Sequence, residues 1–279
     1  MDAMTPKTRT QQADGAIRMA ARRSFWSRNE HALLGSISMM LFLLFWEASV
    51  YFEWVNPLFT SSPSRIVTTG YGMFADGSIW PHLAVSGFEF ITGFGAAIVV
   101  GVPLGIMMGW YRRLNATLDP FVSALYATPR IALLPLIMIW FGIGLESKIA
   151  IVFLGSVFPI LVNTITGVRT INVDFVKVAR SFGASDRQLF MTVALPSSVP
   201  LLLSGLRLGL GHALIGIVVG EMYGAHYGIG HLIATSGARF QTDFVMVGII
   251  IIAGAGVFMT EMLRLIERRF ERWRPNIGG

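Results

Sequence analysis

The sequence predicts an all-α, polytopic membrane protein with six transmembrane helices. Hydrophobic residues make up 53% of the 279 residues, and only 14% are charged. About 25% of the residues of a typical soluble domain are charged. The positive mean hydropathy of +0.61 also indicates an apolar environment. Several apolar runs reach the roughly 20 residues that a helix needs to cross a bilayer.

The apolar runs define six predicted spans. They cover residues 32–52, 84–110, 118–142, 148–168, 197–220 and 244–265. Membrane proteins retain positive charge on the cytoplasmic side. With the N-terminus inside, 17 of the 22 Lys and Arg residues fall in cytoplasmic segments. Only Arg65, Lys148 and Arg239 fall outside, while Arg130 and Arg207 fall within spans. Both termini are therefore expected in the cytoplasm.

The chain is expected to have three parts. Residues 1–31 form a cytoplasmic N-terminal segment, 32–267 a transmembrane domain with a cytoplasmic loop at 169–196, and 268–279 a cytoplasmic tail. No small-residue cleavage site follows the first apolar run, so this run is expected to remain as an anchor. The basic tail is expected to rest on anionic lipid headgroups, with a specific lipid or nucleic-acid site as the alternative. Because membrane topology accounts for the net charge of +6, no nucleic-acid partner is expected.

Glycines at helical spacing predict where the spans pack together. Gly101, Gly105 and Gly109 recur every four residues in the second span, so they share one helix face. The fifth span repeats the pattern with the pairs Gly205 and Gly209, then Gly216 and Gly220. Small residues let membrane helices approach closely, so these faces are interpreted as helix–helix seams. A glycine-lined pore is the alternative.

The third span is predicted to be irregular. Pro129 and Pro135 each remove a backbone donor, and Arg130 lies between them. Irregular backbone at membrane depth is tolerated where it lines a cavity, so a broken span carrying Arg130 is a candidate translocation path. Alternatively, the span starts later and Arg130 is an anchor near the cytoplasmic face.

Carboxylates inside spans are further functional candidates. Glu89 and Glu221 are the two selected as translocation-path candidates, since intramembrane charges are rare without a function. Arg207 is expected to pair with a carboxylate of another span. His226 and His231 follow Glu221 in a glycine-rich loop, but without a nearby acidic cluster they make a weak zinc site. No metal site is expected.

The motifs of several enzyme classes are missing from the chain. There is no phosphate-binding Gly-x-x-x-x-Gly-Lys-[Ser/Thr] loop, no His-Glu-x-x-His and no Gly-x-Ser-x-Gly. Cysteine is also absent, which excludes thiolate chemistry and disulfides. The chain is therefore expected to be a transport subunit and not an enzyme, with any ATP hydrolysis occurring in a partner.

A polar, helix-patterned segment interrupts the apolar chain between the fourth and fifth spans. Asp174 is a predicted N-cap, and Gly183 fits the left-handed position after a helix. Ser185 with Gln188 forms a capping-box pattern for a second short helix, and Pro196 suits the first turn of the fifth span. Two short helices at a fixed angle would form a rigid corner that can transmit force.

This segment resembles the EAA loop of ABC-transporter permeases, which reads Glu-Ala-Ala, three residues, Gly, nine residues, Ile-x-Leu-Pro. Ala179, Gly183, Leu195 and Pro196 match without gaps, and Val193 replaces Ile. Lys177 and Val178 stand where the family usually has Glu and Ala. The resemblance extends over about residues 83–274 and is strongest to the nitrate, sulfonate and taurine branch. The candidate ATPase-coupling residues are Lys177, Val178, Ala179, Arg180, Gly183, Ala184, Ser185, Leu195 and Pro196.

The resemblance implies a type I ABC importer permease fold in the bacterial inner membrane. It also implies a separate ATPase subunit that binds ATP and magnesium, an extracytoplasmic substrate-binding protein, and a second permease copy in a homodimer. The implied function is a translocation path for a small anionic solute such as a sulfonate, taurine, nitrate or a similar organic acid. The binding protein is expected to provide most of the selectivity. A stand-alone secondary transporter or channel is the main alternative, and a membrane-embedded enzyme is another.

Overall fold

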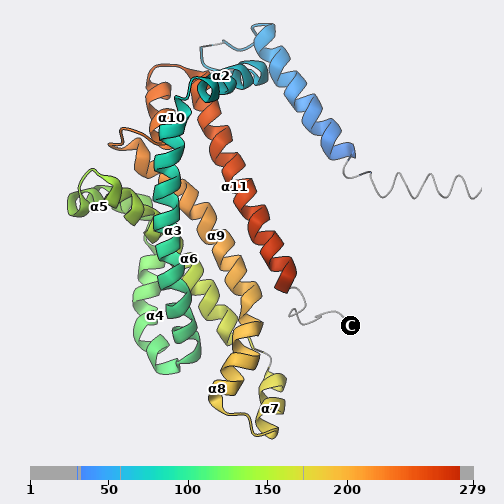
Figure 1. Cartoon of the computed structure of the whole chain (residues 1–279), viewed down its shortest axis with the longest axis vertical. Coiled ribbons are helices and arrows are strands. Elements are labelled where there is room, and N and C mark those ends of the chain that lie inside the picture. Colours follow the sequence, from blue (N-terminus) through green and yellow to red (C-terminus); the bar gives the residue numbers. More distant parts are fainter. Residues whose placement is uncertain (1–29, 31–32, 57, 172, 271–279) are drawn as a thin grey trace, which may run out of the picture. The chain divides into compact units, whose positions relative to one another are not determined.

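A computed structural model of the chain describes residues 30, 33–56, 58–171 and 173–270 (Figure 1). The described residues form helices, turns and loops, with no strand among them. This confirms the all-α prediction. The chain divides into two compact units, Met1–Arg65 and Ile66–Gly279. The predicted N-terminal segment and tail lie outside the described residues, apart from residues 30 and 268–270.

The first unit contains the apolar helix Leu33–Tyr51, the first candidate membrane span. Its C-terminal turns are tied to the following loop by polar contacts. The Trp46 indole N–H donates to the Ser61 carbonyl at 2.7 Å. Glu47 accepts hydrogen bonds from the Ser64 amide at 3.0 Å and from the Ser64 hydroxyl at 2.6 Å. Glu47 thus serves to hold the chain as it leaves the helix.

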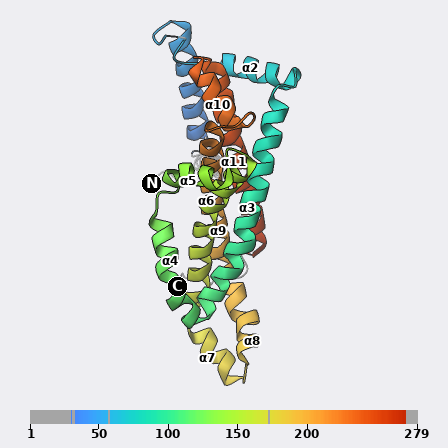
Figure 2. The same cartoon turned by 90° about the vertical axis from the view of Figure 1, so that its left-hand side faces the viewer.

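The second unit contains most of the helices. In chain order after α2 (Pro63–Ala75) they are α3 (Ile79–Trp110), α4 (Arg112–Ala127), the 3₁₀ turn η1 (Arg130–Leu133), α5 (Leu134–Phe141), α6 (Leu145–Arg169), α7 (Val173–Ser181), α8 (Asp186–Leu189), the π-helical segment η2 (Phe190–Ala194), α9 (Leu195–Met222), α10 (Ile229–Ala238) and α11 (Thr242–Phe270). Within this unit, α7 and α8 lie at the opposite end from α10 (Figures 1 and 2).

Five of the six predicted spans correspond to long apolar helices in the described part of the chain. Five single helices are long and apolar enough to cross a membrane. The third predicted span corresponds to a bent pair of shorter helices, in which Arg112–Ala127 and Arg130–Phe141 meet at 89°, as in a broken span or a re-entrant loop. The predicted break in the third span is therefore confirmed, and it falls directly before Arg130.

The glycine seams are also confirmed. A Cβ added to Gly105 would lie 2.7 Å from the Thr164 Cβ, and one added to Gly109 would lie 2.6 Å from the Val168 Cβ. On the other side of α6, a Cβ on Gly205 would lie 2.7 Å from the Asn163 Cβ. Because every larger side chain would collide there, the glycines allow α3 and α9 to pack closely against α6. Helix α6 is thus the centre of the unit.

The expected ion pair of Arg207 is present and connects two spans. The Arg207 guanidinium on α9 lies 2.5 Å from the Glu267 carboxylate on α11. A paired charge at a helix–helix contact avoids most of the penalty of leaving a single charge in an apolar layer. This pair therefore serves to join α9 to α11.

Candidate functional site

Arg130 lies at the bend between α4 and α5. Thr128 ends α4 with extended backbone, and Pro129 precedes the 3₁₀ turn η1. Proline disfavours a helical residue before it, which explains why α4 stops at this point. The Arg130 guanidinium donates to the Gly155 carbonyl at 3.3 Å and to the Tyr126 carbonyl at 3.4 Å. The bend thus aims a cationic side chain at the middle of α6.

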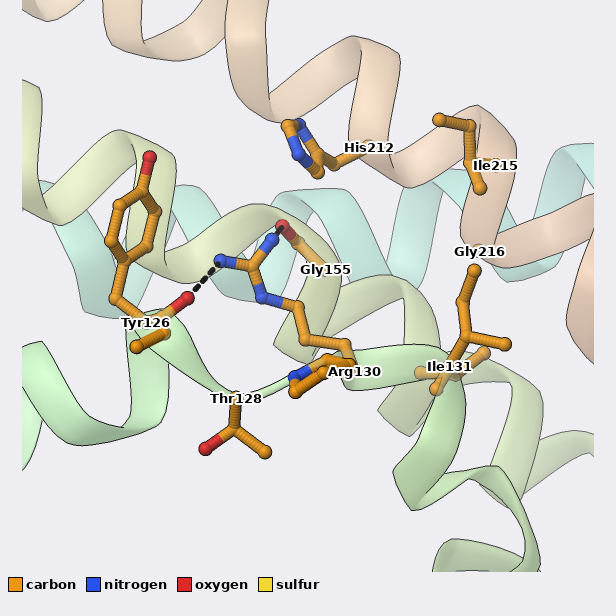
Figure 3. A pocket seen from close by; sticks show the side chains of 11 residues that line it. Tyr126, Thr128, Arg130, Ile131, Gly155, His212, Ile215 and Gly216 are labelled. Atoms are coloured by element: carbon orange, nitrogen blue, oxygen red, sulfur yellow. Dashed lines mark hydrogen bonds between the residues drawn. The ribbon is translucent and has the colours of Figure 1, made fainter.

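The Arg130 side chain lines a pocket of about 460 Å³ between the bend, α6 and α9 (Figure 3). Its walls are mostly apolar. The guanidinium carbon lies 5.2 Å from the centre of the Tyr126 ring and 5.7 Å from that of Phe158. Aromatic faces attract a cation, so these rings stabilise the charge without neutralising it. The pocket is therefore an apolar cavity with one fixed positive group.

His212 is a residue of this pocket that the sequence reasoning missed. It extends from α9 and lines the same cavity as Arg130 (Figure 3). Its Nδ1 lies 2.9 Å from the Leu208 carbonyl oxygen one helical turn earlier. A lone histidine in an apolar span has no local pattern to mark it. Only the approach of α9 to the bend brings it beside Arg130.

Glu221 occupies a different place from Arg130. Its side chain is fully buried at the C-terminal end of α9. The Ser86 hydroxyl on α3 donates to one carboxylate oxygen at 2.5 Å, and the Gly230 amide at the start of α10 donates to the other at 2.6 Å. The Ile229 amide in turn donates to the Ser86 hydroxyl at 2.9 Å. Glu221 thus holds together three helices.

Glu89 is the neighbour of this cluster on α3. It is fully buried, and neither of its carboxylate oxygens has a hydrogen-bond partner among the described residues. Its charged neighbours are Glu221 and Lys148. Lys148, which the topology reasoning counted as outside, is buried in the first turns of α6. Two carboxylates and one ammonium group are therefore enclosed together in the helix bundle.

The three translocation-path candidates therefore fall into two groups. Arg130 lines the pocket at the bend, whereas Glu89 and Glu221 belong to the buried cluster and do not line that pocket.

Beside the cluster, His82 on α3 contacts the backbone of Gly228, with Nδ1 2.8 Å from its carbonyl oxygen. In the described part of the chain, no group of three His, Cys, Asp or Glu side chains could hold a metal ion.

The predicted corner after α7 is present. Gly183 has a φ of +78°, the left-handed region that favours glycine. Its amide donates to the Arg180 carbonyl at 2.9 Å, and the Ala184 amide donates to the Ala179 carbonyl at 3.0 Å. These two bonds form a Schellman motif, which satisfies the last carbonyls of the helix. Gly183 therefore ends α7 at a defined angle.

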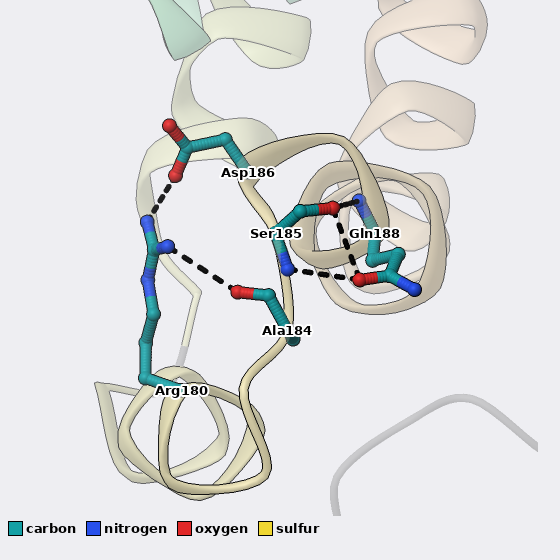
Figure 4. A network of polar contacts seen from close by, with 5 residues as sticks. All are labelled: Arg180, Ala184, Ser185, Asp186 and Gln188. Atoms are coloured by element: carbon teal, nitrogen blue, oxygen red, sulfur yellow. Dashed lines mark hydrogen bonds and ion pairs between the residues drawn. The ribbon is translucent and has the colours of Figure 1, made fainter.

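The capping box of the second short helix is confirmed as well (Figure 4). The Gln188 amide donates to the Ser185 hydroxyl oxygen at 3.3 Å, and the Ser185 amide donates to the Gln188 side-chain oxygen at 2.9 Å. Arg180 crosses the corner, where it pairs with Asp186 and donates to the Ala184 carbonyl at 3.3 Å. These contacts join α7 to α8, and the Arg180 bridge was not predicted.

Two details of the predicted loop were wrong. Asp174 lies inside the first turn of α7, which begins at Val173, and is not its N-cap. The second short helix is also not separate from the fifth span, because Asp186–Met222 is one continuous helix. Pro196 has no N–H for a helical hydrogen bond. The π-helical segment Phe190–Ala194 ends directly before Leu195 and Pro196, which continue the helix, and the Leu195 amide donates to the Phe190 carbonyl five residues earlier. Because α8 and α9 are parts of one helix, a displacement of α8 also displaces α9.

This polar loop also exposes several large apolar side chains. Phe182 is 87% exposed, and Phe175 and Val178 are each more than half exposed. Lys177 is exposed beside them and lies 3.4 Å from Asp174. An exposed cluster of large apolar side chains on a polar loop is typical of a protein–protein contact.

The chain is similar in sequence to known membrane transport proteins. A model of the family "Binding-protein-dependent transport system inner membrane component" matches residues 101–272. The taurine transport system permease protein TauC of Escherichia coli is 31% identical over 93% of this chain and 97% of its own length. The Escherichia coli protein named "Putative aliphatic sulfonates transport permease protein SsuC" is 36% identical over 82% of this chain and 88% of its own.

A solved structure supports the fold. A chain of the MetNI methionine ABC transporter, solved in inward-facing conformations, superposes with a TM-score of 0.54 at 19% identity. The match covers 71% of this chain and 94% of that chain. The described helices thus have the type I ABC importer permease fold that the sequence predicted.

Proposed function

This chain belongs to the family of binding-protein-dependent transport system inner membrane components, and on that premise we propose that it forms the translocation path for a small organic anion. It is a multi-pass transport subunit and not an enzyme. The proposed solutes are sulfonates such as taurine, or similar organic acids. Support comes from the names of TauC and SsuC and from the positive charge of Arg130 in an otherwise apolar pocket.

We propose that a separate ATPase subunit, which binds ATP and magnesium, docks on the loop at 174–196. The observation that carries this proposal is the rigid corner at Gly183, whose exposed Phe182 and Val178 offer an apolar contact. Because α8 continues into α9, a push on the corner moves α9, whose residues His212, Ile215 and Gly216 line the Arg130 pocket. Closure of the ATPase would thereby alter the pocket without any flexible linker.

The remaining parts of the assembly follow from the same proposal. An extracytoplasmic binding protein delivers the solute, and a second copy of this chain completes a homodimer. Both termini face the cytoplasm, which places α7 and α8 on the side of the ATPase. Lys177 stands where related loops usually carry Glu, so the facing surface of the ATPase is expected to be acidic at that point. A neighbouring Asp174 already balances part of the Lys177 charge.

The test is uptake of radiolabelled taurine into proteoliposomes. The permease is reconstituted with its ATPase and its binding protein, and then without the ATPase. We expect uptake only when ATP and all three components are present. Full uptake by the permease alone would contradict the proposal and would indicate a secondary transporter or channel.

A second measurement examines the docking surface. Phe182→Asp should abolish co-purification of the ATPase, because a carboxylate would replace the most exposed apolar side chain of the loop. Tyr71→Asp is the matched control, since Tyr71 is 77% exposed on α2, outside the loop. Equal retention of the ATPase by both variants would show that the loop is not the docking site.

A further inference from the structure

The guanidinium of Arg130 is not neutralised within the described part of the chain. No carboxylate there forms an ion pair with it, and its Nε is buried without a hydrogen-bond partner. Its two hydrogen bonds, to the carbonyls of Gly155 and Tyr126, are both long for N–H···O bonds, at 3.3 and 3.4 Å. A guanidinium has five N–H donors in a planar fork that fits an oxyanion. Arg130 therefore retains capacity to bind an anion in the pocket.

His212 adds a second polar group of a different kind. Its Nδ1 lies 2.9 Å from the Leu208 carbonyl oxygen, which can only accept a hydrogen bond. The proton of the neutral ring is therefore on Nδ1, and Nε2 carries a lone pair. The neutral imidazole can accept a hydrogen bond from a ligand in this pocket but cannot donate one through Nε2. The pocket thus offers one anion-binding group and one acceptor.

The remaining lining suits a short hydrocarbon link between two polar ends. Ile131, Ile151 and Ile215 contribute apolar walls, while Gly155 and Gly216 let α6 and α9 pack closely at the edge of the pocket. A volume of about 460 Å³ lies in the lower part of the range of small-molecule sites. Such a cavity holds a small organic ion with some of its water.

We propose that this pocket in the permease binds a small zwitterion, with its oxyanion on Arg130 and its ammonium group on Nε2 of His212. The corresponding chemical class is the aminoalkanesulfonates. This inference rests on the proposed function and adds that the permease itself, and not only its binding protein, recognises the solute. An anionic lipid headgroup has the same oxyanion chemistry, and the experiment separates the two sources.

The first test varies the ligand and leaves the protein unchanged. The permease–ATPase complex, without binding protein, is placed in nanodiscs of phosphatidylcholine. Binding is measured for taurine, for ethanesulfonate, which lacks the ammonium group, and for 2-aminoethyl methyl sulfone, which lacks the negative charge. We expect taurine to bind about tenfold more tightly than ethanesulfonate, because ethanesulfonate loses one charge-assisted hydrogen bond. The aminosulfone should bind most weakly, because it is a cation that has lost its bond to Arg130 and is repelled by the guanidinium. Equal binding of all three, or binding of none, would overturn the proposal.

The second test assigns each end of the ligand to a residue. His212→Leu should remove the advantage of taurine over ethanesulfonate and leave ethanesulfonate binding unchanged. Arg130→Gln should weaken both sulfonates by about tenfold or more, and Arg130→Lys should weaken them less, since it keeps the charge but loses the fork. Arg264→Gln, which removes the same charge from the surface of α11, is the matched control and should bind like the wild type. If Arg130→Gln does not assemble with the ATPase, the binding of the sulfonates to Arg130→Lys and the comparison of the three ligands on the wild type test the proposal instead.

Two further arms separate the possible explanations. If phosphatidylglycerol nanodiscs copurify lipid that Arg130→Gln loses, and taurine does not bind in phosphatidylcholine, the pocket is a lipid site and the proposal is wrong. Normal ATP-dependent uptake by the wild type together with unchanged uptake by Arg130→Gln and His212→Leu would overturn the zwitterion site alone. Absence of ATP-dependent uptake by the wild type would instead overturn the proposed function.

Discussion

The Ser86 hydroxyl donates a 2.5 Å hydrogen bond to the buried carboxylate of Glu221, and this contact joins residues 135 positions apart. Ser86 also accepts from the Ile229 amide, so one side chain connects α3, the end of α9 and the start of α10. The Ser86 hydroxyl therefore provides a hydrogen-bond donor for the buried carboxylate and a hydrogen-bond acceptor for an amide at the start of α10. This makes the fully buried Glu221 a structural residue at the junction of three helices.

Ser86→Ala should destabilise the protein by about 2–4 kcal/mol, because it leaves a buried carboxylate oxygen and a buried amide without this partner. Thermal unfolding in detergent checks the effect. Thr92→Ala is the control, since the Thr92 hydroxyl donates only within its own helix, to the Phe88 and Glu89 carbonyls. A Ser86→Ala protein as stable as Thr92→Ala would contradict the role of the contact.

Gly105→Ala should lower the unfolding temperature, because the added Cβ would lie 2.7 Å from the Thr164 Cβ and 3.0 Å from the Leu161 carbonyl oxygen. Overpacking of this kind typically costs about 1–3 kcal/mol. Gly95→Ala on the same helix meets nothing within 4 Å and should be neutral or stabilising. The two variants are compared in one thermal-shift series, and an equal response would show that the seam tolerates a methyl group.

Gly183→Val should uncouple ATP hydrolysis from transport. A residue with a Cβ in the left-handed conformation is strained by about 1–2 kcal/mol, and a β-branched side chain is worse. No atom lies within 4 Å of the added Cβ, so the effect comes from the backbone alone. Gly183→Asn should retain most coupling, since Asn tolerates positive φ. The readout is solute imported per ATP hydrolysed, and a normal ratio in Gly183→Val would refute the role of the corner.

Arg207 and Glu267 should show strong energetic coupling. Arg207→Leu leaves a mostly buried carboxylate without this partner, and Glu267→Leu leaves the guanidinium without its own. The double variant replaces both charges by apolar groups, so it should be more stable than the sum of the single effects predicts. A double-mutant cycle of unfolding free energies measures this coupling. Strictly additive effects would show that the pair contributes nothing.

His231 on α10 should make stability depend on pH. Burial lowers the pKa of His231 from its usual value near 6.5, and the nearby His82, His226, Lys148 and Arg239 lower it further. The folded state thus binds fewer protons than the unfolded state, so stability is full above pH 6.5 and falls as the pH drops through that value. The unfolding temperature should decrease between pH 7 and pH 5.5, and His231→Gln should reduce that decrease. An unchanged pH profile in the variant would contradict this assignment.

The corner and the capping box of the loop at 174–196 could be predicted from the sequence, because each depends on residues only a few positions apart. The left-handed Gly183 and the capping box of Ser185 with Gln188 both occur where the sequence placed them. The continuity of α8 with α9 could not be predicted in the same way. Pro196 signals a helix start, but the π-helical segment before it accommodates the missing donor, and its formation depends on how the helix packs.

For the buried polar groups as well, some features could be predicted from the sequence and others could not. The sequence indicated that Arg207 needs a carboxylate from another span, since a charge in an apolar segment is rarely left alone. It could not indicate which carboxylate, and Glu267 lies 60 residues away. Lys148 was counted on the extracytoplasmic side, and hydropathy alone could not indicate that its side chain is buried near Glu89, because it does not reveal which face of a helix is enclosed.

The sequence by itself determined the membrane-spanning architecture, the break in the third span, the glycine seams and the corner at Gly183. Each depends on hydropathy, on helical spacing or on backbone preference, which are properties of neighbouring residues. Tertiary structure alone decided that Arg130 shares a pocket with His212 and that Glu221 is held by Ser86. These partners lie 82 and 135 positions apart, and only the packing of α3 and α9 against α6 brings them together.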